Sequence, residues 1–93
     1  MGISIELLTK YKEELTLGGP VVPMEEQSLY ALHKQQLQQL STLLSSAPDP
    51  KAIRELVAAQ RQAFGRSFLS GEHGDRIERA FHALASALEE QYA

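Results

Sequence analysis

Apolar side chains recur at intervals of three or four residues in four separate stretches, and this spacing constrains the fold more than any other feature. Such intervals place the apolar side chains on one face of an α-helix. No stretch alternates apolar and polar residues over a useful length, so no strand is expected. The pattern predicts an all-α protein, a small antiparallel bundle of about four helices spanning approximately residues 3–16, 24–46, 50–70 and 76–92.

Glycine and proline mark the first two breaks between these stretches. Residues 18–23 contain two glycines and two prolines, which cannot continue a helix. Asp49 and Pro50 suit the N-cap and the first position of the third helix. The intervening connection, Ala47–Pro48, is short, so we expect the second and third helices to be antiparallel.

The boundary between the third and fourth helices is also marked by glycine and acidic residues. Gly71 suits the C-terminal stop of the third helix. Asp75 and Glu78 have the spacing of a capping box at the start of the fourth. Gly65 lies inside the third pattern, where either the helix breaks or a neighbour approaches the bare backbone; we expect an intact helix.

The length and composition exclude several classes of protein. A chain of 93 residues supports one domain, and we expect residues 1–93 to form a single helical domain. It has no cysteine, which excludes disulfides, thiolate metal sites and cysteine nucleophiles. No apolar run approaches the roughly 18 residues of a membrane span, and the first residues do not resemble a signal peptide. We therefore expect a cytoplasmic protein that does not contact membranes.

Histidines and carboxylates form no recognisable catalytic or metal-binding pattern. His33 lies on the apolar face of the second predicted helix, where a core or interface role is expected. Glu78 and His82 are four residues apart, whereas di-iron bundles use a spacing of three on two helices. His73 lies between two glycines and is expected in an exposed loop. With no nucleophile elbow and no phosphate-binding glycine loop, we expect no enzymatic activity, no metal and no cofactor.

Charge is segregated along the chain. Residues 1–26 hold five acidic and two basic side chains, net −3, and residues 67–93 hold the same numbers. Residues 27–66 hold two acidic and five basic side chains, net +3. Arg54 and Arg61 belong to a basic stripe on the third helix, which either pairs with acids of the neighbouring helices or recognises acids on a partner. So few basic residues beside acidic segments predict no nucleic-acid surface.

The second predicted helix is nearly free of charge. Between Gln27 and Pro48 the only formal charge is Lys34. The face opposite its leucine stripe consists of amides and hydroxyls, including Gln35, Gln38 and Gln39. Charged residues are depleted at the centres of protein interfaces. This face is therefore either an ordinary polar surface or a contact with another chain, which could be a second copy or a different protein.

Residues 64–75, which read Phe-Gly-Arg-Ser-Phe-Leu-Ser-Gly-Glu-His-Gly-Asp, are followed by Ile77-Glu78 and Phe81-His82. Together they resemble small helical proteins of Gram-negative bacteria, some of which are immunity proteins encoded beside interbacterial toxins. The resemblance covers roughly the last third of the chain. It implies a small, acidic, cysteine-free cytoplasmic protein that blocks a toxin by covering its active site or substrate cleft.

We therefore expect a non-enzymatic protein-binding module, an immunity protein that neutralises a cognate bacterial toxin by occluding its active site. The alternative is a homodimeric helical adaptor or regulatory protein that uses helix 24–46. Acids near the chain ends would contact a basic channel in the toxin, which would speed association. The predicted partner-binding residues are Glu13, Glu14, Gln35, Gln38, Gln39, Arg54, Arg61, Glu72, His73 and Asp75.

Overall fold

The computed structural model describes residues 3–46, 49–66 and 69–92. These residues form four α-helices and two short 3₁₀ turns, and they contain no strand. The elements in chain order are α1 (Ile3–Gly18), η1 (Gly19–Val21), η2 (Met24–Glu26), α2 (Gln27–Ser45), α3 (Pro50–Arg66) and α4 (Gly71–Gln91). The predicted all-α class is confirmed.

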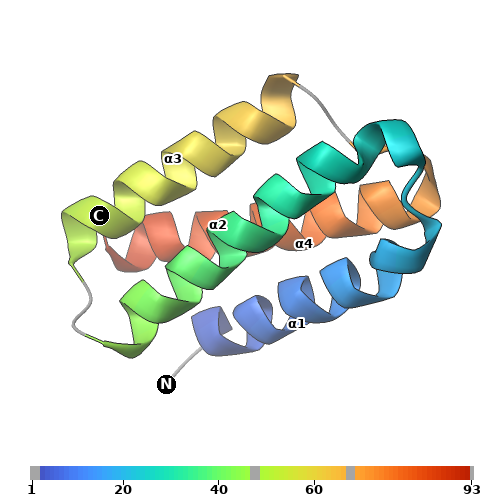
Figure 1. The fold of residues 1–93 in the computed structure, drawn as a ribbon. Coiled ribbons are helices and arrows are strands. Elements are labelled where there is room, and N and C mark those ends of the chain that lie inside the picture. Colours follow the sequence, from blue (N-terminus) through green and yellow to red (C-terminus); the bar gives the residue numbers. More distant parts are fainter. Residues whose placement is uncertain (1–2, 47–48, 67–68, 93) are drawn as a thin grey trace.

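Successive helices run in opposite directions and pack into a four-helix bundle (Figure 1). α1 packs along α4, and α3 packs against both α2 and α4, whereas α1 and α2 meet over a smaller area. The radius of gyration is 12.6 Å, which is typical of a compact chain of about this length. The predicted antiparallel arrangement is therefore confirmed, including that of α2 and α3. The Ala47–Pro48 connection itself lies outside the described residues.

Each helix contributes one ring to a continuous chain of rings through the core. The His33 ring of α2 stacks on Phe64 of α3, with centroids 3.9 Å apart. Phe64 stacks on Phe81 of α4 at 4.7 Å, and Phe81 contacts Tyr11 of α1 at 5.7 Å. Aromatic pairs at such distances add to the stabilisation from buried area alone. The four apolar stripes thus converge on one core.

The boundary between α3 and α4 differs from the prediction. α3 passes through Gly65 but ends at Arg66, before the predicted position 70. Ser67 and Phe68 lie outside the described residues. α4 begins at Gly71 instead of residue 76, so the predicted capping box at Asp75 is wrong because that residue is already helical. Gly71 has a φ of +84°, a conformation available to glycine, and it starts α4 rather than ending α3.

A contact distant in sequence explains the early start of α4. The carboxylate of Glu26 accepts hydrogen bonds from the Ser70 backbone N–H at 2.8 Å and from its hydroxyl at 2.7 Å. These bonds hold the pKa of Glu26 below its usual value. Ser70 is the residue before α4, so a carboxylate from the α1–α2 connection is placed at the N-terminus of that helix, where negative charge is favourable.

The first two helices also differ from their predicted limits. α1 extends past residue 16 to Gly18, and Gly19–Val21 then forms the turn η1. Residues 24–26, predicted as the first turn of the second helix, are the separate 3₁₀ turn η2. A 3₁₀ turn at a helix end is common because it satisfies backbone groups that the α-helix leaves free.

Candidate functional site

The three predicted glutamines lie together on α2. Gln35, Gln38 and Gln39 are exposed and line a shallow hollow shared with Leu43 of α2 and Leu56 of α3. This face of α2 presents amide and hydroxyl groups around two partly buried leucines. It can contact another protein without the cost of removing water from a charge.

The predicted acids on α1 point in different directions. Glu13 is exposed, whereas Glu14 is buried with an exposed fraction of 7%. A carboxylate oxygen of Glu14 lies 3.8 Å from the ammonium group of Lys10 one turn earlier. Glu13 is therefore available to a partner on the surface, while Glu14 faces into the bundle.

The two predicted arginines on α3 are engaged with α4. Arg61 forms a two-point ion pair with Glu89 at 2.8 and 2.9 Å, and its Nη1 lies 3.0 Å from Nδ1 of His82. The hydrogen bonds with Glu89 raise the pKa of Arg61 and lower that of Glu89. Arg54 donates to the backbone carbonyl of Tyr92 at 3.2 Å. The basic stripe thus joins α3 to α4 within the molecule.

The predicted residues at the start of α4 lie on a helix instead of in a loop. His73 is half-buried and packs beside Gly18, whose added Cβ would lie 3.6 Å from the Cβ of His73. Glu72 and Asp75 are exposed, and Glu72 pairs with Arg76 at 3.0 Å. The expected exposed loop around His73 is wrong because α4 starts one turn earlier.

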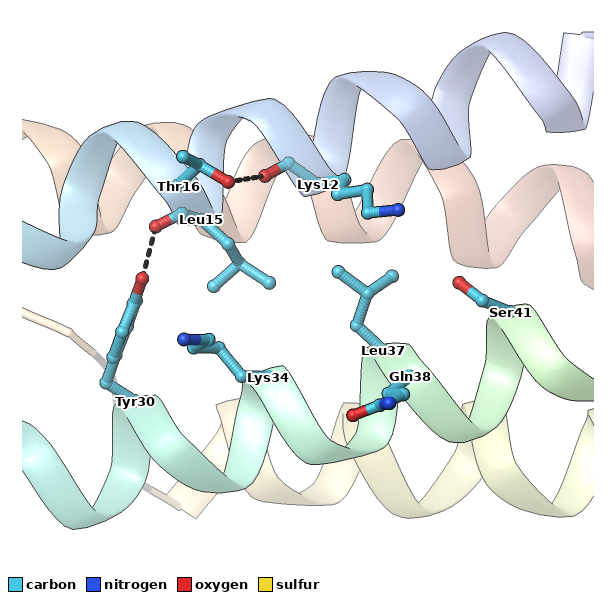
Figure 2. Close-up of a pocket in the computed structure, with 8 residues that line it drawn as sticks. All are labelled: Lys12, Leu15, Thr16, Tyr30, Lys34, Leu37, Gln38 and Ser41. Carbon is cyan, nitrogen blue, oxygen red and sulfur yellow. Dashed lines mark hydrogen bonds between the residues drawn. The ribbon is translucent and has the colours of Figure 1, made fainter.

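The best-formed hollow lies between α1 and α2 and has a volume of about 420 Å³ (Figure 2). Leu15 of α1 and Leu37 of α2 point toward one another at its floor, and both are buried. Lys12 projects from α1 and Lys34 from α2. The full lining is Lys12, Leu15, Thr16, Tyr30, Lys34, Leu37, Gln38 and Ser41. We call this hollow the α1/α2 groove.

Tyr30 fixes one end of the α1/α2 groove. Its hydroxyl donates to the backbone carbonyl of Leu15 across the two helices. A Cβ built on Gly19 would lie 2.6 Å from that hydroxyl, so glycine leaves room for the ring. Burial raises the pKa of Tyr30. The ammonium group of Lys34 lies 5.6 Å from the centre of the Tyr30 ring, within cation–π range.

Lys12 and Lys34 give the α1/α2 groove a positive charge, and none of the described residues that line it carries a carboxylate. Within residues 3–46, 49–66 and 69–92, neither Lys12 nor Lys34 forms an ion pair. Sequence reasoning found Gln38 but missed both lysines and the leucine floor. Lys34 was visible as the only charge between Gln27 and Pro48, but nothing in the sequence showed that it lines the same hollow as Lys12.

The remaining histidines occupy core and surface positions. His33 is fully buried, neither ring nitrogen has a hydrogen-bond partner in the described part of the chain, and burial lowers its pKa to about 4. His82 lies 3.6 Å from Glu78 on the surface of α4. The described residues bring no three histidines or carboxylates together in the manner of a metal site.

None of the helices in the described residues has both the length and the apolar character needed to cross a membrane. No protein-family model matches the chain, and comparison with curated proteins and with solved structures found no similar protein.

Proposed function

We propose that this protein is a non-enzymatic binding module, an immunity protein that acts in the cytoplasm by occluding the active site of a cognate bacterial toxin. The observation that carries the proposal is the continuous surface formed by the α1/α2 groove and the exposed glutamines of α2. This surface combines apolar contacts with uncharged polar groups, and such a composition is typical of the centre of a protein interface.

Charge around this surface suits a role in recognition. Lys12 and Lys34 lie in the groove, and the acidic side chain of Glu13 follows Lys12 on α1. Charges of both signs near an uncharged centre select partners and speed association more than they add affinity. Occlusion needs no catalytic group on this chain, only a rigid surface that stays in place over the toxin.

Co-expression with the toxin encoded beside this gene tests the proposal. We expect the protein to protect the host and to copurify with the toxin. Gln39→Lys places a charge in the proposed contact and should weaken binding about tenfold or more, because an unpaired charge is costly at an interface. Gln62→Lys, the same change at an exposed position of α3, is the matched control. Absence of both a complex and protection would refute the proposal.

A homodimer through α2 is the second candidate. Leu32 is 40% exposed and lies on the same side of α2 as Gln35 and Gln39, at spacings of three and seven residues. This row is long enough for a short antiparallel contact between two copies of α2. Sedimentation would separate the two candidates. A monomer at every concentration would rule out the homodimer, whereas a dimer that Gln39→Lys dissociates would support it.

A further inference from the structure

We propose that the α1/α2 groove binds an acidic amphipathic helix of the partner protein, with Lys12 and Lys34 contacting its carboxylates. This inference rests on the proposed protein-binding function and names the chemistry of the segment that is recognised. It assigns a role to the two lysines and to the leucine floor, none of which is used in the contacts between α3 and α4.

The dimensions of the groove fit a helix. Its lining on α2 runs from Tyr30 to Ser41, which at 1.5 Å per residue is about 16 Å, or three helical turns. Leu15 and Leu37 form an apolar floor between two antiparallel helices. An amphipathic helix laid into such a groove inserts apolar side chains spaced three, four and seven residues apart.

The charges of the groove select an acidic occupant. Two lysines and no carboxylate line it, although the chain has 12 acidic residues. The remaining polar lining consists of neutral side chains, Thr16, Tyr30, Gln38 and Ser41, which donate or accept hydrogen bonds. A basic helix would be repelled by both lysines. A nucleic acid would meet only two cations beside an apolar floor, which is a poor match for a row of phosphates.

The groove is preformed. The Tyr30 hydroxyl is bonded to the Leu15 carbonyl, which fixes the spacing of α1 and α2 at one end. A preformed surface avoids part of the entropy cost of ordering side chains upon binding. The groove is also open to solvent along one side, so a small anion would remain partly exposed, whereas a helix would cover the full length.

The probe is a synthetic 14-residue helical peptide with leucines on one face and glutamates flanking them, compared with the same peptide carrying lysine for each glutamate. Wild-type protein should bind the glutamate peptide at least about tenfold more tightly, since each exposed ion pair is worth up to about fivefold. The double variant K12E/K34E should reverse this preference. The matched control K51E/R66E reverses two exposed charges on α3 and should leave the preference unchanged.

NMR shift changes in the wild-type protein locate the peptide. The inference expects them along residues 12–16 and 30–41. Changes located elsewhere, or a peptide preference that K12E/K34E leaves intact, would overturn it. Dodecanoate and anionic lipid vesicles serve as further probes, and binding of either one without binding of the glutamate peptide would also overturn it.

A capture experiment with the native partner separates this inference from the proposed function. If wild-type protein and K12E/K34E capture the toxin equally well, the function stands and the assignment of the groove is wrong. If wild-type protein captures nothing, the proposed function fails, and the peptide experiment still decides what the groove binds.

Discussion

α1 contacts two neighbours in contrasting ways. Against α4 it packs along its length: Ser4 donates a hydrogen bond to Gln91 at one end, Tyr11 meets Phe81 in the middle, and Gly18 lies against Ile77 at the other end. Against α2 it makes a smaller contact and leaves the α1/α2 groove open (Figure 1, Figure 2).

The residues at the two contacts differ. A Cβ on Gly18 would come within 2.8 Å of the Ile77 side chain, so the α1 backbone is already close to α4 at this end of their contact, the α1/α4 seam. At the contact of α1 with α2, the α1/α2 seam, α2 instead presents Tyr30 and Lys34 to the groove. The distance between helix axes depends on the side chains at the contact, and the long side chains of Tyr30 and Lys34 lie where α1 and α2 leave the groove open.

With the proposed function, this contrast assigns stability and recognition to different helix contacts within one small bundle. The closed α1/α4 seam buries apolar surface and stabilises the fold. The α1/α2 groove presents Lys12 and Lys34, which have no ion-pair partner among the described residues, and we propose that it serves binding. Four experiments compare the core, the α3/α4 ion pair and the groove in their effects on stability, beginning with the largest expected effect.

Truncation of a buried leucine of α4 and truncation of a leucine at the floor of the α1/α2 groove should lower the free energy of unfolding by unequal amounts. Leu84→Ala removes a fully buried side chain from α4 and should lower the free energy of unfolding by about 4 kcal/mol. Leu37→Ala removes a groove-floor side chain that is 6% exposed and should cost only about 2 kcal/mol, because water reaches the space that it leaves. Urea denaturation measures both. Equal losses would show that the groove floor is packed as tightly as the core of α4.

His33, which stacks on Phe64 of α3, should make the free energy of unfolding depend on pH. Burial lowers the pKa of His33 from 6.5 to about 4, so between these values the unfolded chain binds the proton and the folded chain does not. Above pH 6.5 the titration of His33 therefore does not lower the free energy of unfolding. As the pH falls, the free energy of unfolding decreases by about 2 kcal/mol at pH 5 and by about 3 kcal/mol once the pH is below 4. Denaturation curves at pH 7 and pH 5 measure it.

His33→Phe is the control for this pH dependence. Its ring can keep the stacking on Phe64 and cannot bind a proton. His73 and His82 are present in both proteins. Any difference between the proteins in the stability lost from pH 7 to pH 5 therefore reports His33 alone. Glu26 and Glu89, whose pKa values are lowered, titrate below this range. If both proteins lose stability equally, His33 is not the buried neutral group that the structure shows.

The ion pair between α3 and α4 should contribute less than either core effect. The side chains of Arg61 and Glu89 are 33% and 45% exposed, so solvent screens their attraction. Glu89→Gln should therefore lower stability by only about 0.5 kcal/mol. Glu90→Gln, an exposed neighbour with no ion pair in the described residues, should change stability by less. A thermal melt in low salt compares the two variants, and indistinguishable melts would show that the pair adds nothing.

Charge reversal in the groove should affect stability least. K12E/K34E removes two positive charges that have no ion-pair partner among the described residues. It also removes the solvent-exposed cation–π contact of Lys34 with Tyr30, so the free energy of unfolding should fall by no more than about 0.5 kcal/mol. Urea denaturation measures this directly. A large loss would mean that the lysines hold the α1/α2 seam together, and the separation of stability from binding would then be wrong.

The fold was largely readable from the sequence, whereas the candidate site was not. Tyr11, His33, Phe64 and Phe81 each lie in a different one of the four predicted helices, and the structure joins them in one chain of rings. The start of α4 was misjudged because its N-terminus is held by Glu26, 44 residues before Ser70. A capping rule based on local spacing favoured Asp75 because it cannot include so distant a carboxylate.

The sequence by itself determined that this chain forms four helices, and it determined which face of each one is apolar. It did so because helix periodicity and helix breakers act over only a few residues. Only the tertiary structure decided that Arg61 pairs with Glu89 and that Lys12 and Lys34 line one hollow between α1 and α2. Those features depend on how closely two helices approach, and this distance is set jointly by side chains far apart in the sequence.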